Sequence, residues 1–134
     1  MGAWGTGIFE DDCGCDVLSD ILDAEDLIAE LGERLSRALE TDYIEYDEAF
    51  DALVPAAVID AYTSGTKHTG LGDLPPRPPK ISELRGRAAD AVSRVLGPDV
   101  EIHTLWRENA ADYPRWKQNL ESLVARLRSN ANAN

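Results

Sequence analysis

The chain is poor in the residues that most often carry out chemistry, with two cysteines and two histidines among 134 residues. Cys13 and Cys15 are separated by one glycine, so a disulfide between them would close a strained ring. These cysteines, together with His68 and His103, match the ligand number of a structural zinc site. Because Cys-x-Cys is a tight spacing and the histidines are far apart, we expect no metal and no cofactor, and zinc at these four residues is the alternative.

Long apolar runs are also missing. No run approaches the roughly 20 residues that span a membrane, and the N-terminus lacks the basic and apolar regions of a signal peptide. Unpaired cysteines are typical of the cytosol. We therefore expect a cytoplasmic protein that does not associate with membranes.

Familiar catalytic motifs are absent as well. The chain has no Gly-x-Ser-x-Gly, no His-Glu-x-x-His and no Walker sequence. Gly2, Gly5 and Gly7 lack the preceding strand and the lysine of a phosphate-binding loop. These absences favour a protein that is not an enzyme.

Basic residues are scarce in the first part of the chain. Residues 1–60 contain 17 acidic residues and two basic ones, a net charge of −15, whereas residues 61–134 contain 8 acidic and 11 basic residues, a net charge of +3. Such a field repels phosphates, so we expect no nucleic-acid partner. The acidic half is either a solvated surface or a docking surface for a basic protein, and its candidate residues are Asp16, Asp20, Asp23, Asp26 and Glu30.

Apolar residues recur at helical spacing over most of the chain. This pattern predicts a compact all-α domain of five or six helices over residues 1–128, followed by a frayed tail at residues 129–134. The first amphipathic stretch covers residues 17–39. It should break near Asp23, where a run of acidic residues can cap a second helix.

The middle of the chain predicts one helix and one irregular connection. Residues 46–63 repeat the amphipathic pattern and should end at Gly65, with a kink or a restart at Pro55. Residues 65–80 hold four prolines and three glycines, which rule out regular structure.

The remaining helices follow from caps and aromatic residues. Ser82 should cap a helix that Gly97 ends in a left-handed conformation. A short helix carries Trp106, and the last helix opens near Tyr113 and carries Trp116. The spacing of these tryptophans predicts core positions.

The first nine residues have neither a helical nor an extended period. We expect Trp4 and Phe9 to be buried against later helices, because a terminal segment is ordered only when burial offsets the cost. Gly5 or Gly7 should have a positive φ or touch another backbone. The carboxylate that caps the following helix should come from Asp11 or Asp12.

The opening Met-Gly-x-Trp-Gly-x-Gly-x-Phe-x-x-Asp resembles the start of a family of uncharacterised small bacterial proteins, the DUF4259 domain family. Residues 43–49 and 56–61 are similar to the middle of that family. Residues 95–108, together with Trp116 and residues 123–127, are similar to its end. Cys13 and Cys15 depart from its pattern, where small and apolar residues are expected. The resemblance implies a fold and no chemistry.

Three hypotheses of function remain open. The first is a non-catalytic, inhibitor-like or immunity-like protein that binds a basic protein partner through its acidic half. The second is a metal-dependent hydrolase that uses N-terminal carboxylates with one later glutamate, from the set Asp12, Asp16, Asp20, Glu45 and Glu108. The third is a structural or oligomeric role.

Overall fold

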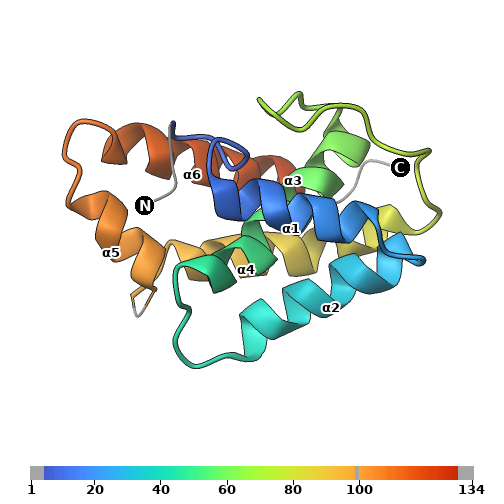
Figure 1. Cartoon of the computed structure of the whole chain (residues 1–134), viewed down its shortest axis with the longest axis horizontal. Coiled ribbons are helices and arrows are strands. Elements are labelled where there is room, and N and C mark those ends of the chain that lie inside the picture. The colour runs from blue at the N-terminus through green and yellow to red at the C-terminus, as the bar shows by residue number, and fades with distance from the viewer. Residues whose placement is uncertain (1–4, 99, 130–134) are drawn as a thin grey trace.

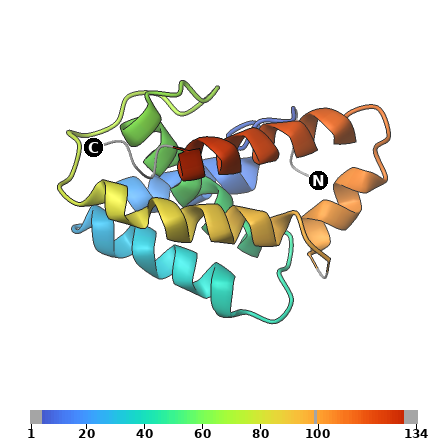
Figure 2. The same ribbon diagram turned by 180° about the vertical axis from the view of Figure 1, so that it is seen from behind.

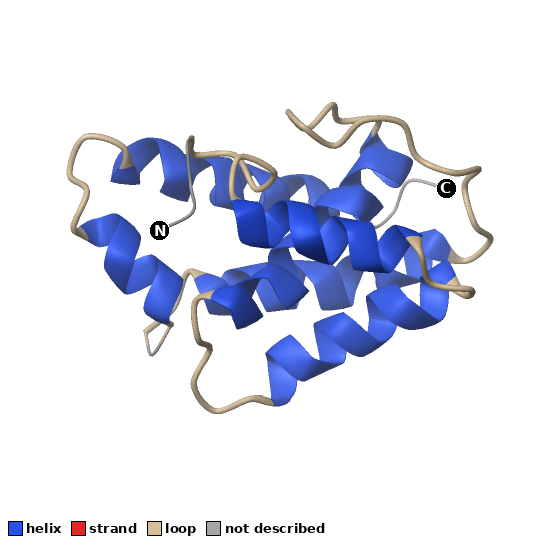
Figure 3. Cartoon of the chain, in the orientation of Figure 1, coloured by secondary structure: helices blue, strands red, loops and turns tan. Residues whose placement is uncertain are grey.

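The computed structural model describes residues 5–98 and 100–129, and within these ranges it forms six α-helices and two short 3-10 helices (Figure 1). No strand is formed in this part of the chain (Figure 3), although an isolated bridge joins Ile44 to Val100. The all-α prediction is confirmed. The elements are α1 (Asp12–Leu22), α2 (Leu27–Glu40), η1 (Asp47–Ala49), α3 (Phe50–Ser64), η2 (Ile81–Leu84), α4 (Arg85–Val95), α5 (Glu101–Arg107) and α6 (Tyr113–Ser129).

Helix α3 lies at the centre of the fold. It packs against α1, which lies toward the viewer in Figure 1. It also packs against α4 and α6, which lie toward the viewer in Figure 2, where the molecule is seen from behind. Every residue from Ala52 to Asp60 is buried. The sequence pattern predicted a single apolar face, and this is wrong, because α1, α2, α4 and α6 together cover α3 on several sides.

Pro55 lies inside α3, and the helix continues through it without a restart. The proline removes one backbone hydrogen bond, at a cost of roughly 3 kcal/mol. Burying a single aliphatic side chain contributes about 1.5–3 kcal/mol, so the apolar residues of α3 together outweigh that cost. The helix ends as predicted at Gly65, which has φ 73° and donates its N–H to the carbonyl of Ala61.

Two aspartates start the first two helices. The side chain of Asp11 accepts a hydrogen bond from the N–H of Cys13 at 2.8 Å, and that of Asp26 accepts one from Ala29 at 3.1 Å. Each satisfies a first-turn N–H that has no partner within its helix. The predicted break between α1 and α2 is confirmed.

The expected caps of α4 are wrong. Ser82 lies inside η2, and its hydroxyl accepts a hydrogen bond from Arg77 at 2.7 Å, so α4 begins later, at Arg85. Lys80, with φ 67°, makes the turn that precedes η2. At the other end α4 stops near Gly97, whose φ is not positive and whose N–H donates to the carbonyl of Arg94 at 3.0 Å.

Aromatic residues from both ends of the chain lie in the core. Phe9 is 2% exposed, and Trp106 and Trp116 stack with ring centroids 6.0 Å apart. These are the core positions that the sequence predicts. Trp4 lies outside the described residues, so its burial stays a prediction.

The first two described glycines, Gly5 and Gly7, lie close to a side chain. A Cβ atom at Gly5 or Gly7 would lie 2.5 or 2.8 Å from the carboxylate of Glu10, a side chain and not a backbone. The close backbone approach is at Gly14 in α1, where a Cβ would overlap the carbonyl oxygen of Ile8. Positive φ angles occur at Gly65, Gly70 and Gly72.

The end of the chain adds one difference. Ser129, expected in the tail, is the last residue of α6, and residues 130–134 lie outside the described part. Within residues 5–98 and 100–129 no helix is long and apolar enough to cross a membrane.

Candidate functional site

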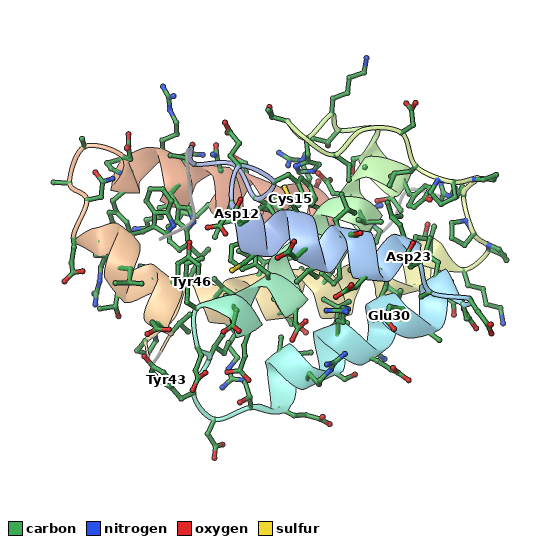
Figure 4. All side chains as sticks on the ribbon, in the orientation of Figure 1. Asp12, Cys15, Asp23, Glu30, Tyr43 and Tyr46 are labelled. Atoms are coloured by element: carbon green, nitrogen blue, oxygen red, sulfur yellow. The ribbon has the colours of Figure 1, made fainter. Side chains whose placement is uncertain are left out.

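The carboxylates predicted as a partner surface lie on α1 and at the turn into α2. Asp16 and Asp20 are one helical turn apart, Asp23 ends α1 and Asp26 precedes α2, and all four are exposed. Figure 4 shows Asp12 and Asp23 at the two ends of α1 and Glu30 on the neighbouring α2, on the same side of the molecule. Since Asp12 is also exposed, we define the acidic face as Asp12, Asp16, Asp20, Asp23 and Asp26.

Glu30 is excluded from the acidic face because Arg34 neutralises it. The Nε atom of Arg34 lies 2.7 Å from the Glu30 carboxylate, and its Nη1 atom lies 2.9 Å from that of Asp51 on α3. Its Nη2 atom is 3.9 Å from Asp20, whose side chain is 72% exposed. Arg34, with a side chain only 12% exposed, therefore connects α1, α2 and α3.

Some acidic residues of the first half are used inside the fold. Asp11 is 3% exposed and accepts a hydrogen bond from the Tyr46 hydroxyl in addition to capping α1. Burial and this carboxylate raise the pKa of Tyr46. Asp51 and Asp60 are likewise held by arginines. The acidic face consists of aspartates of α1 and of the turn that follows it, all of which stay exposed.

The two cysteines are free thiols in an acidic setting. Cys13 is half-buried and Cys15 is exposed. Burial and then the carboxylate of Asp11 raise the pKa of Cys13, and burial and then that of Asp12 raise the pKa of Cys15. A raised pKa keeps a thiol protonated, and the protonated form is a poor nucleophile and metal ligand.

Both histidines have partners other than the cysteines. His68 Nε2 lies 3.0 Å from the carboxylate of Asp60. His103 Nδ1 lies 3.1 Å from the carbonyl of Gly97, so this nitrogen carries the proton, and Nε2 faces the hydroxyl of Tyr113 at 2.7 Å. The four residues of the zinc alternative are thus engaged in separate interactions.

The carboxylates of the hydrolase hypothesis are also spread over the surface. Glu45 precedes η1 and Glu108 follows α5, and both are exposed, as are the three aspartates of α1. In the described part of the chain, no three His, Cys, Asp or Glu residues lie close enough to hold a metal ion. The hydrolase hypothesis stays a prediction without a gathered ligand set in those residues.

Asp60 forms a buried charge cluster that the sequence did not predict. Its carboxylate is 0% exposed and accepts hydrogen bonds from Arg126 Nε at 3.0 Å and from His68. The Nη2 atom of Arg126 forms an ion pair with the same carboxylate at 3.0 Å. Burial alone would raise the pKa of Asp60, but the hydrogen bonds from His68, Arg126 and Thr66 and the charge of Arg126 lower it to about 2. A charged residue within the apolar run of residues 52–61 in α3 was the available signal.

A polar cleft lies over this cluster. It has a volume of about 340 Å³ and is lined by three segments that are distant in sequence, residues 6–10, 67–69 and 119–126. Lys67, His68 and Arg126 line it together with Glu10, whose Oε1 accepts the N–H of Gly7 at 3.2 Å. We refer to it as the polar cleft.

The chain was compared with known proteins. It matches the family described as a domain of unknown function, DUF4259, over residues 2–119. No curated protein and no solved structure matches it significantly. The matched range includes the N-terminal segment, the acidic face and every helix up to the first part of α6. The chain therefore belongs to the DUF4259 family.

Proposed function

We propose that the protein is a non-catalytic interaction protein that binds a basic protein partner through the acidic face. The observation that supports this best is the position of Asp20 and Asp23 at the C-terminal end of α1, whose last turn has no basic residue. The carbonyl end of a helix carries partial negative charge, so carboxylates there do not stabilise α1. Surface features that lower stability are often tied to function.

The charge distribution supports the same proposal. The molecule carries a net charge of −12, and its first 60 residues carry −15. A partner with a basic surface would be attracted to α1 before contact, which speeds association and makes it sensitive to salt. Inhibitors of basic toxins or nucleases bind in this way, and we place this protein in that functional class.

The experiment compares two variants of equal charge. One replaces Asp16, Asp20 and Asp23 with asparagine. The control replaces three exposed acidic residues of the second half, as Asp73→Asn, Glu83→Gln and Glu121→Gln. Each full-length protein is used to recover partners from a native lysate at low salt.

We expect the unmodified protein and the control to recover the same basic protein, and the variant of the acidic face to recover much less. Raising the salt concentration should release the partner. Recovery of no basic protein, or equal recovery by both variants, would refute the proposal.

Association between copies of this chain is the competing explanation of salt-sensitive binding. Sedimentation of the purified protein at low and at high salt separates the two. If the protein is a monomer at both salt concentrations, the acidic face binds a different protein. A salt-sensitive dimer that the same three substitutions abolish would instead favour the oligomeric role.

A further inference from the structure

The polar cleft differs from the acidic face in position and in charge. Its walls come from the N-terminal segment, the connection after α3, and α6, so residues far apart in sequence meet in one concave site. A volume of about 340 Å³ is in the range of sites that hold small molecules. Unlike a typical apolar pocket, this site offers the hydroxyl groups of Thr6, Thr69 and Ser122 and the amide of Asn119.

Positive charge is in excess around this site, although the protein as a whole is strongly acidic. Lys67 and Arg126 line the cleft, and Arg85 lies nearby, since its Nη2 donates to the carbonyl of Arg126 at 2.7 Å and its charge interacts with Asp60. Glu10 is the acidic residue among those that line the cleft. Two positive side chains of the lining, Lys67 and Arg126, therefore stand against one negative side chain.

Arg126 is held in place for binding. Its Nε atom donates to Asp60 and its Nη2 atom lies 3.0 Å from the same carboxylate, and these two contacts fix the plane of the guanidinium. An arginine has five N–H donors, so these contacts leave donors for a ligand. Its side chain is 36% exposed and lines the cleft. Lys67 on the adjacent loop is exposed and can swing toward the same ligand.

We propose that the polar cleft binds a small anion, a carboxylate or a phosphate group, between Lys67 and Arg126. Arg126 provides a fixed pair of planar donors, and Lys67 provides a mobile charge that approaches from the solvent. Glu10 also lines the cleft and repels the anion, which limits the affinity. This site involves none of the residues of the acidic face, so the two proposals can fail independently.

The test is a titration of the full-length protein, followed by the backbone amide resonances of residues that line the cleft. Sodium acetate and sodium phosphate are added separately, and sodium chloride keeps the ionic strength constant. Saturable shifts at Lys67, Thr69, Ser122 and Arg126 are expected. Saturation by phosphate alone or by acetate alone identifies the preferred anion.

Three variants make the result specific. Lys67→Gln should weaken binding about two- to five-fold, the range expected for one exposed ion pair. Glu10→Gln should strengthen it, because a repulsive charge is removed. Lys117→Gln removes an exposed charge from α6 outside the cleft and should leave the affinity unchanged. Shifts that do not saturate, or an affinity that Lys67→Gln and Lys117→Gln alter equally, would overturn the proposal.

Discussion

Asp60 is an ionised carboxylate in a fully buried position, and a charge in such a position is stable only with direct partners. His68 comes from the connection after α3 and Arg126 from α6, so this one residue joins the central helix to two later parts of the chain. Arg126 also pairs the acidic first half with the basic second half.

The first prediction concerns replacement of Asp60 by asparagine. The free energy of unfolding at neutral pH should fall by about 1.5–3 kcal/mol, because hydrogen bonds to a charged acceptor are lost. The pKa of Asp60, about 2 in the folded protein, lies below its ordinary value. Its contribution is therefore complete above about pH 4 and is lost as the pH falls toward 2.

Urea unfolding measured from neutral to acidic pH tests this prediction. The difference between the unmodified protein and Asp60→Asn should narrow as the pH falls from about 4 to about 2. A difference that stays constant over this range would mean that the charge of Asp60 is not what stabilises the cluster.

At the scale of elements, the start of α1 depends on a glycine that has no side chain to obstruct the preceding segment. The carbonyl of Ile8 lies directly against the Cα of Gly14, and the ring of Phe50 at the start of α3 is also close. This close packing lets the N-terminal segment fold back over α1. The contact between Gly14 and the Ile8 carbonyl could not be predicted from the sequence, because tertiary structure decides which residue packs against a glycine.

The second prediction compares two glycine-to-alanine replacements. Gly14→Ala should lower the free energy of unfolding by about 1–3 kcal/mol, since its Cβ must displace the Ile8 backbone. Gly86→Ala in α4 meets nothing within 4 Å and should raise stability by about 0.4–1 kcal/mol. Thermal unfolding of both variants gives the comparison, and two shifts of the same sign would show that the contact at Gly14 is not tight.

Helix boundaries were predictable where one local signal acts alone. Acidic caps marked the starts of α1 and α2, and Gly65 marked the end of α3. The prediction that Ser82 caps α4 failed because a serine hydroxyl can accept a hydrogen bond either from a backbone N–H or from another side chain. Here it accepts one from Arg77. The central position of α3 could not be read from its own sequence alone, because it depends on which helices pack around it.

The candidate site was predictable in the same uneven way. The acidic face lies on one helix and its following turn, so helical spacing was sufficient to group most of it. Glu30 could be excluded from the acidic face only once the structure placed Arg34 between three helices. The polar cleft combines residues from three distant segments, such as Thr6, Lys67 and Arg126, and no local pattern connects them.

For the whole molecule, the decisive property is the uneven distribution of charge. Residues 1–60 carry −15 and the remainder carries +3. Salt bridges offset only part of this inside the fold, through Arg34 and Arg126. Asp12, Asp16 and Asp20 lie one helical turn apart on the exposed side of α1, and each such like-charged pair costs roughly 0.2–0.5 kcal/mol.

The last prediction is that the acidic face lowers stability at low salt. Replacing Asp16, Asp20 and Asp23 with asparagine changes the net charge from −12 to −9. It should raise the free energy of unfolding by about 0.5–1.5 kcal/mol at about 10 mM salt, by removing repulsion along α1 and unfavourable charges at its C-terminal end. At about 200 mM salt the difference in the free energy of unfolding between the variant and the unmodified protein should largely disappear, because the Debye length falls from about 30 Å to about 7 Å.

The control variant Asp73→Asn, Glu83→Gln and Glu121→Gln has the same net charge, but its substitutions lie in the half that is already positive. It should gain little at low salt, because removing negative charge there increases the local excess of positive charge. Equal gains in the two variants would show that net charge alone sets the salt dependence. A gain confined to the acidic face would mean that these carboxylates reduce the stability of the isolated protein, and a basic partner that neutralises them would then bind with the additional free energy of the relieved repulsion.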